Sequence, residues 1–241
     1  MATAGIAPRR CPAALGVQIE LRMMTRSLIT ATLGAAIAAS IVLAQLAPPK
    51  IIVLVGPPGS GKTTQARILA KKYGIPAFSV SDLLKKQISS QPNDPVLAAA
   101  IASGDLLPDD AASELIRVHL LRADLHKGFI LDGYPATLGQ AKALDQMLRD
   151  QQLPGAIVVL LEASDDVIRK RMHARHRVDD KPGIIEQRIN EFRNEALLLT
   201  AWAGESRVVR VNANAGIPSV SAQIVAGLED AWSNPPLQQR P

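Results

Sequence analysis

Ile51-Ile52-Val53-Leu54-Val55 runs directly into Gly56-Pro57-Pro58-Gly59-Ser60-Gly61-Lys62-Thr63, and these thirteen residues decide the fold. The first five are apolar and mostly β-branched, which is typical of a buried strand. The next eight match the pattern G-x-x-x-x-G-K-[ST], and residues 63–72 are predicted to continue as a helix that ends near Gly74. A glycine-rich loop between a strand and a helix is the setting in which this motif binds phosphate groups.

The residue types in this loop suit a triphosphate. Glycines let the backbone wind closely around phosphate oxygens and direct its N–H groups toward them, and the following helix adds its positive end. Lys62 can reach the β- and γ-phosphates, and the Thr63 hydroxyl can coordinate Mg²⁺. The sequence therefore predicts a nucleotide site formed by Gly56, Gly59, Ser60, Gly61, Lys62, Thr63 and Thr64.

Two further elements suit the same chemistry. Phe129-Ile130-Leu131 reads as a second buried strand, and Asp132 at its carboxyl end suits a carboxylate that holds Mg²⁺ through water. By itself Asp132 would be interpreted as a turn or cap residue, and the phosphate loop before it favours the metal role.

Arginines form the third element. Arg171 and Arg175 are four residues apart on a predicted helix, so they share a face, and Arg177 and Arg188 follow. Guanidinium groups gathered at one cleft stabilise the charge that moves during phosphoryl transfer. Spacing alone favours a solvated basic face, since Arg169 and Lys170 lie on the same predicted helix, but the order of the whole pattern favours the phosphate-binding role.

The rest of the chain alternates apolar runs with helical stretches. Strands are predicted at residues 157–161 and 208–211, and helices at residues 82–89, 109–125, 138–151, 165–175, 184–199 and 220–232. Fully apolar strands separated by helices predict an α/β fold whose parallel sheet is covered on both faces.

Composition excludes several classes of protein. The chain has 241 residues, of which 47% are hydrophobic, 20% charged and 3% aromatic, so an aliphatic core is expected. Its one cysteine, Cys11, excludes an internal disulfide framework and a multi-cysteine zinc site. The formal net charge is +5, but residues after 49 contribute only +2, which argues against a general nucleic-acid binder.

The N-terminal segment, residues 1–48, stands apart. Residues 27–49 carry no formal charge, and Arg22 and Arg26 precede a long apolar run. This pattern fits an export signal, a membrane anchor, an organelle transit peptide, or a disordered tail behind a misassigned start. Any membrane contact is expected only through this segment. Pro48-Pro49 marks a natural boundary before the domain expected at 49–234, and a flexible tail is expected at 235–241.

Beyond residue 50 the sequence resembles the adenylate kinases, within the nucleoside monophosphate kinases. GPPGSGKTTQ at 56–65 resembles the family's GxPGxGKxTQ, and IPAFSVSDLLK at 75–85 resembles IPxISTGDxLR. SGDLLPDD at 103–110 resembles GxLVPDE, and GFILDGYPATLGQA at 128–141 resembles GFLLDGFPRTxxQA. RVDD at 177–180, followed by Arg188, resembles the lid signature RxDD…R.

The resemblance implies a three-layer α/β/α fold of the P-loop NTPase type that transfers a phosphoryl group from ATP to AMP. It also implies a small helical acceptor-binding insert at about 79–107, a short lid at about 176–187, a monomer and a cytoplasmic location. Lys62, Arg175, Arg177, Arg188 and Asp132 would be catalytic, Arg171 and Arg175 would contact ATP, and Asp179 and Asp180 would fix the closed lid. The acceptor would meet Ser79, Val80, Asp82, Lys85, Gly133, Gln140, Arg177 and Arg188.

Departures from the family pattern concentrate on the acceptor side. The arginine of GFPR, which grips the AMP phosphate, is replaced by Ala136, and the arginine of GDxLR by Lys85. Lysine keeps the charge but loses the bidentate fork. These changes predict a weakened phosphate clamp, and two alternatives stay open: a kinase for another small acceptor, or a nucleotide-binding pseudo-kinase whose acceptor site has decayed.

Overall fold

The computed structural model describes residues 48–90, 107–175, 182–204 and 207–234. The N-terminal segment up to residue 47, most of the expected acceptor insert, and the lid residues Arg177, Asp179 and Asp180 lie outside the described residues, as does the tail from 235. In the described part of the chain, no helix combines the length and apolar character that crossing a bilayer requires.

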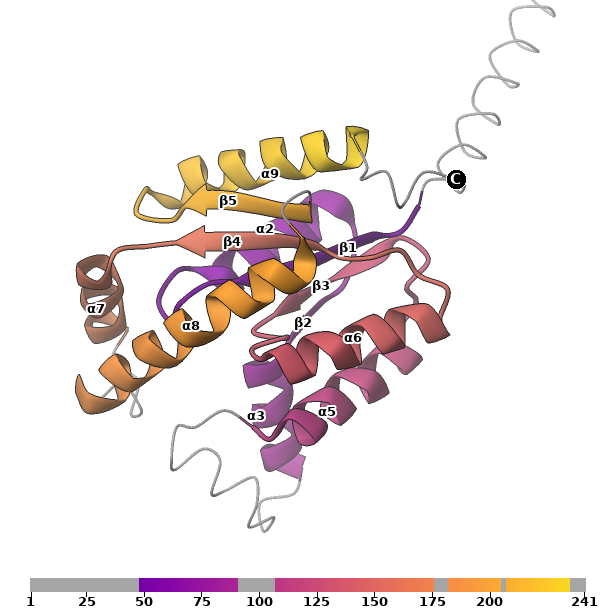
Figure 1. The fold of residues 1–241 in the computed structure, drawn as a ribbon, viewed down its shortest axis with the longest axis horizontal. Coiled ribbons are helices and arrows are strands. Elements are labelled where there is room, and N and C mark those ends of the chain that lie inside the picture. Colours follow the sequence, from indigo (N-terminus) through magenta and orange to yellow (C-terminus); the bar gives the residue numbers. More distant parts are fainter. Residues whose placement is uncertain (1–47, 91–106, 176–181, 205–206, 235–241) are drawn as a thin grey trace, which may run out of the picture. The chain divides into compact units, whose positions relative to one another are not determined.

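A parallel sheet forms the centre of the described domain (Figure 1). Its strands are β1 (Lys50–Val55), β2 (Ala77–Ser79), β3 (Gly128–Asp132), β4 (Ile157–Glu162) and β5 (Val208–Asn212). They lie in the order β2-β3-β1-β4-β5, and every pairing is parallel. The predicted α/β class and parallel sheet are confirmed.

Helices cover both faces of this sheet. The helices are α2 (Lys62–Tyr73), α3 (Val80–Ser90), α5 (Asp109–Arg122), α6 (Leu138–Asp150), α7 (Asp165–Ala174), α8 (Pro182–Ala203) and α9 (Ile217–Ser233). Alternate residues of β1 point to opposite faces. Ile51, Val53 and Val55 pack with α5, α6 and α8, whereas Ile52 and Leu54 pack with α2 and α9. The result is the expected three-layer α/β/α arrangement (Figure 1).

Local signals explain where the elements near the site begin and end. Helix α2 starts after Gly61 (φ 101°) and ends at Gly74 (φ 64°), whose N–H donates to the Ala70 carbonyl. Thr137 caps α6, because its hydroxyl accepts a hydrogen bond from the Gln140 N–H. Both glycines adopt left-handed backbone angles that other residues rarely tolerate.

The topology places a crevice at the carboxyl end of β1. The chain leaves β1 toward β2 on one side, whereas β4 and β5 lie on the other side of β1. In open parallel sheets, ligands bind at such a switch in direction, beyond the carboxyl ends of the strands. The phosphate loop follows β1, Asp132 ends β3, and α7 follows β4 after two intervening residues, so all three meet this crevice.

Candidate active site

The phosphate loop joins β1 to α2 through a tightly packed turn. A Cβ atom at Gly56 would lie 2.8 Å from the Ser60 hydroxyl and 2.9 Å from Leu161, so only glycine fits there. Gly59 and Gly61 have φ angles of 78° and 101°. The Ser60 hydroxyl is buried and has no hydrogen-bond partner among the described residues. Ser60 is itself a residue of the phosphate loop, and an oxygen of a bound phosphate would satisfy such a hydroxyl.

Lys62 lies folded over its own loop. Its ammonium donates hydrogen bonds to the carbonyl oxygens of Gly56, at 2.6 Å, and Pro57, at 3.0 Å. Burial lowers the pKa of Lys62 to about 8; the nearby Asp132 carboxylate opposes this shift and the Arg175 guanidinium adds to it. A bound triphosphate would place negative charge beside this ammonium and so stabilise its charged form.

This lowered pKa predicts proton uptake when ATP binds. Above pH 8 most of the free protein carries a neutral Lys62, whereas the bound phosphates favour the charged form. ATP affinity should therefore fall by up to about tenfold for each pH unit above 8. Calorimetry at pH 8.5 in buffers of different ionisation enthalpy measures the uptake. In a Lys62→Arg control the charge is permanent, so equal proton uptake in both proteins would refute the prediction.

Thr63 and Asp132 meet across the crevice. The Thr63 hydroxyl donates a 2.6 Å hydrogen bond to Asp132 Oδ2, and the Asp132 side chain is buried at the end of β3. A hydroxyl and a carboxylate are oxygen ligands of the kind that Mg²⁺ prefers, so this pair fits the metal expected beside a triphosphate. The two residues that the sequence assigned to the metal are 69 positions apart and in contact.

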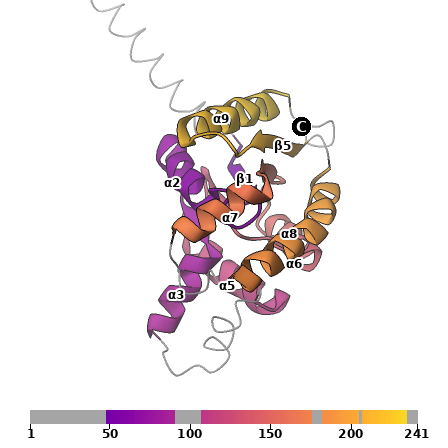
Figure 2. The same cartoon turned by 90° about the vertical axis from the view of Figure 1, so that its left-hand side faces the viewer.

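A cavity of about 520 Å³ opens beside the loop. Its lining includes Lys62, Thr63, Asp132 and three of the predicted arginines, Arg171, Arg175 and Arg188. The loop residues Gly56, Gly59, Gly61 and Thr64 also line it. All described members of the predicted donor site except Ser60 therefore line one cavity. Arg171 lies on α7, Arg175 directly follows α7, and Arg188 lies on α8 (both helices are labelled in Figure 2).

Arg171 is fixed on the wall of this cavity. Its guanidinium donates hydrogen bonds to the carbonyl oxygens of Ala213 (2.8 Å), Asn214 (3.5 Å) and Ala215 (3.2 Å), which follow β5. The contacts tie α7 to the loop between β5 and α9. Arg171 thereby presents a flat cation at the edge of the cavity, where a donor nucleotide can lie against it.

The acceptor side carries fewer cations. Ala136, Gly133 and Val80 line the cavity, but Lys85 is not among its described lining residues. The Lys85 ammonium instead lies 3.9 Å from Asp82, an exposed carboxylate that also lies 3.8 Å from Arg67. Ser79 is the last residue of β2 and directly precedes α3, the helix that carries Asp82 and Lys85.

Gln140 supports the backbone next to Ala136. Its side-chain oxygen accepts a 2.8 Å hydrogen bond from the Ala136 N–H, and the residue is 2% exposed. The Tyr134 hydroxyl donates to the Gln140 carbonyl at 3.1 Å and shares a 2.9 Å hydrogen bond with the Ser113 hydroxyl. These buried hydrogen bonds fix the 133–136 segment against α5 and α6.

One face of α8 also lines the cavity, although the residues on it other than Arg188 belong to none of the sequence motifs. Glu191, Phe192, Glu195 and Leu199 line the space together with Arg188. Glu195 Oε2 is buried and has no hydrogen-bond partner among the described residues. Helical spacing supplies the signal that finds these residues: positions three, four, seven and eleven after Arg188 share its face.

Fold and site together define a P-loop phosphotransferase. The family model for adenylate kinase matches residues 54–204. The adenylate kinases of Brucella ovis, Brucella canis and Brucella abortus (strain S19) are each 35% identical over 185 residues, which cover 72% of this chain and 95% of theirs. The chain therefore belongs to the adenylate kinase family. It is a phosphotransferase of the nucleoside monophosphate kinase group.

Proposed function

We propose that the protein catalyses ATP + AMP = 2 ADP by direct, in-line phosphoryl transfer. The observation that carries the proposal is the convergence of the phosphate loop, the Thr63–Asp132 pair and the arginines of α7 and α8 on one cavity. The similarity to the Brucella adenylate kinases supports the same reaction. No covalent enzyme intermediate is needed, because the acceptor phosphate is itself an anion.

Each residue has a distinct task in the transfer. The loop amides between Gly56 and Thr63 hold the triphosphate, and Lys62 neutralises its terminal phosphates. Arg175 and Arg188 stabilise the negative charge on the transferring group. Arg177, and the lid carboxylates Asp179 and Asp180, are assigned to closing over it. Closure of the lid at about 176–187 excludes water, which would otherwise accept the phosphoryl group.

Mg²⁺ fits beside this loop. Thr63 would hold it directly, and Asp132 would hold it through water. When bound, the ion neutralises phosphate charge and orients the terminal phosphates. The hydrogen bond between the two side chains already keeps these oxygens next to each other in the free protein.

A panel of acceptors tests the proposal. Full-length protein is mixed with Mg²⁺, ATP and one acceptor at a time: AMP, GMP, CMP, UMP, a sugar acid, or none. ADP is measured by a coupled assay. We expect AMP to give the highest kcat/KM, with a high KM because Ala136 and Lys85 weaken the phosphate clamp. Faster transfer to another acceptor would instead support the alternative kinase suggested by those two positions. ATP binding without turnover on any acceptor would support a pseudo-kinase.

The domain limits and the setting of the enzyme are part of the proposal. The kinase domain spans 49–234, its acceptor insert about 79–107, and the enzyme acts as a monomer in the cytoplasm, where ATP is abundant. Light scattering and cell fractionation test the last two points. Recovery of the protein in a membrane or exported fraction would assign residues 1–48 to targeting or anchoring instead.

A further inference from the structure

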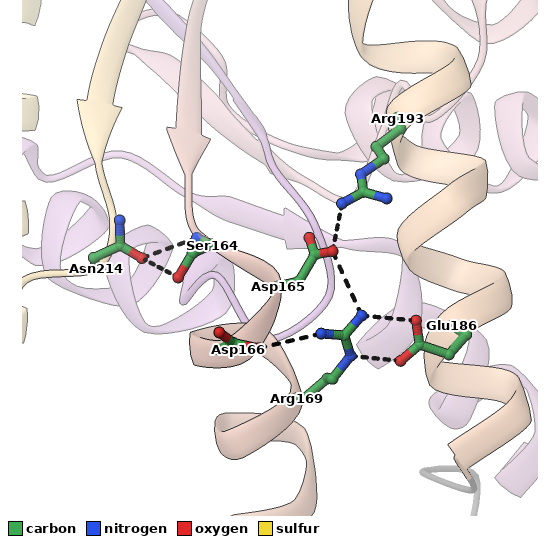
Figure 3. Close-up of polar contacts among 7 residues, drawn as sticks. All are labelled: Ser164, Asp165, Asp166, Arg169, Glu186, Arg193 and Asn214. Atoms are coloured by element: carbon green, nitrogen blue, oxygen red, sulfur yellow. Dashed lines mark hydrogen bonds and ion pairs between the residues drawn. The ribbon is translucent and has the colours of Figure 1, made fainter.

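The helices α7 and α8 carry an ion-pair network (Figure 3), and its residues are not among those that line the cavity. Arg169 of α7 donates two hydrogen bonds to the Glu186 carboxylate of α8, at 2.6 Å and 3.0 Å. The same guanidinium lies 3.3 Å from Asp166 and 3.5 Å from Asp165. Arg193 of α8 donates to Asp165, so the network joins the helices at two points.

An apolar contact lies beside this network. Ile168 and Met172 of α7 pack against Ile185 and Ile189 of α8, and all four side chains are at most 2% exposed. The two helices therefore touch along a narrow apolar strip. Such a strip holds them together but leaves them able to roll about it, because dispersion contacts have little directional preference.

The cavity arginines project from the side opposite the network. At 100° per residue, Arg171 and Arg175 lie about 200° and 240° around α7 from Arg169. On α8, Arg188 lies about 200° from Glu186, whereas Arg193 lies within about 20° of it. Each helix thus has an ionic stripe on one side of the apolar strip and cavity arginines on the other. A roll that opens the ionic stripe would displace the arginines.

We propose that the Arg169–Glu186 pair, supported by Asp165 and Arg193, is a positioning device that sets the angle of Arg175 and Arg188 over the transferring phosphate. The inference rests on the proposed phosphoryl transfer, and it concerns residues that do not line the cavity. The bidentate geometry fixes orientation as well as distance between the helices. A second tie anchors the start of α7: the Ser164 N–H and hydroxyl both donate to Asn214 Oδ1, at 2.9 Å and 3.2 Å.

The electrostatics agree with a formed pair. The hydrogen bond from Arg169 holds the pKa of Glu186 below its usual range, and the same bond raises the pKa of Arg169. Both side chains are substantially exposed, 38% for Arg169 and 49% for Glu186. Exposed ion pairs contribute little to global stability. Loss of the pair should therefore alter helix geometry more than folding.

The test is a double-mutant cycle on full-length protein, with Glu186→Gln, Arg169→Met and the combined variant. We expect each single change to lower kcat about tenfold while the KM for ATP changes less than threefold, because small displacements of catalytic groups are costly. The double variant should be no slower than either single variant, since both remove the same pair.

A matched control is present on α5. Arg117 donates to Glu114 at 2.7 Å and 2.8 Å, and these side chains are 48% and 56% exposed. Neither residue lines the cavity, so Glu114→Gln breaks a similar exposed pair outside the site, and kcat should stay within twofold. Equal losses in Glu114→Gln and Glu186→Gln, additive losses in the cycle, or an unchanged kcat in Glu186→Gln would overturn the proposal.

A second readout separates this proposal from the reaction itself. Amide hydrogen exchange in α7 and α8 should increase in Glu186→Gln without a matching fall in the melting temperature. If wild-type protein failed to use AMP, the proposed function would fall, and this exchange measurement would still decide whether the pair sets the helices. Unchanged exchange in both helices would refute the positioning role.

Discussion

Replacing Lys62 with methionine is expected to lower kcat for phosphoryl transfer by about 10²–10³-fold, because a single well-placed electrostatic stabiliser contributes on that scale. The ammonium is the cation held directly over the loop, by the carbonyls of Gly56 and Pro57. Methionine has a similar length and no charge, so the loop keeps its packing while the terminal phosphates lose their partner. Rapid-quench measurement of ADP formation checks the rate.

The same variant should keep or gain stability. In the folded protein the pKa of Lys62 is about 8, below its unfolded value of 10.5, so the charged form is disfavoured by folding. For wild type, this group makes the free energy of unfolding rise between pH 8 and 10.5, and the methionine variant should lack that rise. Lys142→Met, an exposed change on α6, is the control for both measurements. A Lys62→Met enzyme with wild-type turnover would contradict the role of the loop.

Introducing arginine at Ala136 is expected to lower the KM for AMP by roughly 10- to 100-fold. Ala136 lines the cavity where the family pattern places the arginine that grips the acceptor phosphate. A hydrogen bond to a charged group contributes about 1.5–3 kcal/mol, which corresponds to that change in affinity. Steady-state kinetics with AMP as the varied substrate measures the effect.

Two companion variants sharpen this result. Ala136→Lys supplies the charge without the bidentate fork and should recover only part of the gain. Glu195 lines the same cavity, and one of its carboxylate oxygens has no hydrogen-bond partner in the described part of the chain, so it can draw the new guanidinium away from AMP. Adding Glu195→Gln to Ala136→Arg should therefore lower the KM for AMP further. No change in this KM in any of the variants would mean that the acceptor phosphate does not bind beside Ala136.

The donor half of the site was predictable because its chemistry is local. The phosphate loop is one contiguous stretch, and its strand–loop–helix setting is visible in Ile51–Ile52 and the glycines that follow. Asp132 required only the recognition of a second buried strand. The contact between Asp132 and Thr63 follows from the parallel pairing of β1 and β3, which brings the carboxyl ends of both strands together.

Other features depend on tertiary packing, which the sequence pattern does not predict. Strand β2 has only three residues, none of them buried, so its sequence lacks the apolar run that predicts a buried strand. Only its parallel pairing with β3 shows that it is part of the sheet. The cavity-facing carboxylate of Glu195 looks like any polar residue of an amphipathic helix until the face of α8 is known. Arg169 and Glu186 lie on two different helices, 17 residues apart in the sequence, so no spacing rule within one helix predicts their pairing.

The most direct test of the proposed reaction is ³¹P nuclear magnetic resonance on full-length protein with Mg²⁺, ATP and AMP. We expect two molecules of ADP for each ATP and AMP consumed, with no inorganic phosphate, and we expect the reaction to run backward from ADP alone. Release of one ADP and one inorganic phosphate per ATP, with AMP unchanged, would contradict it.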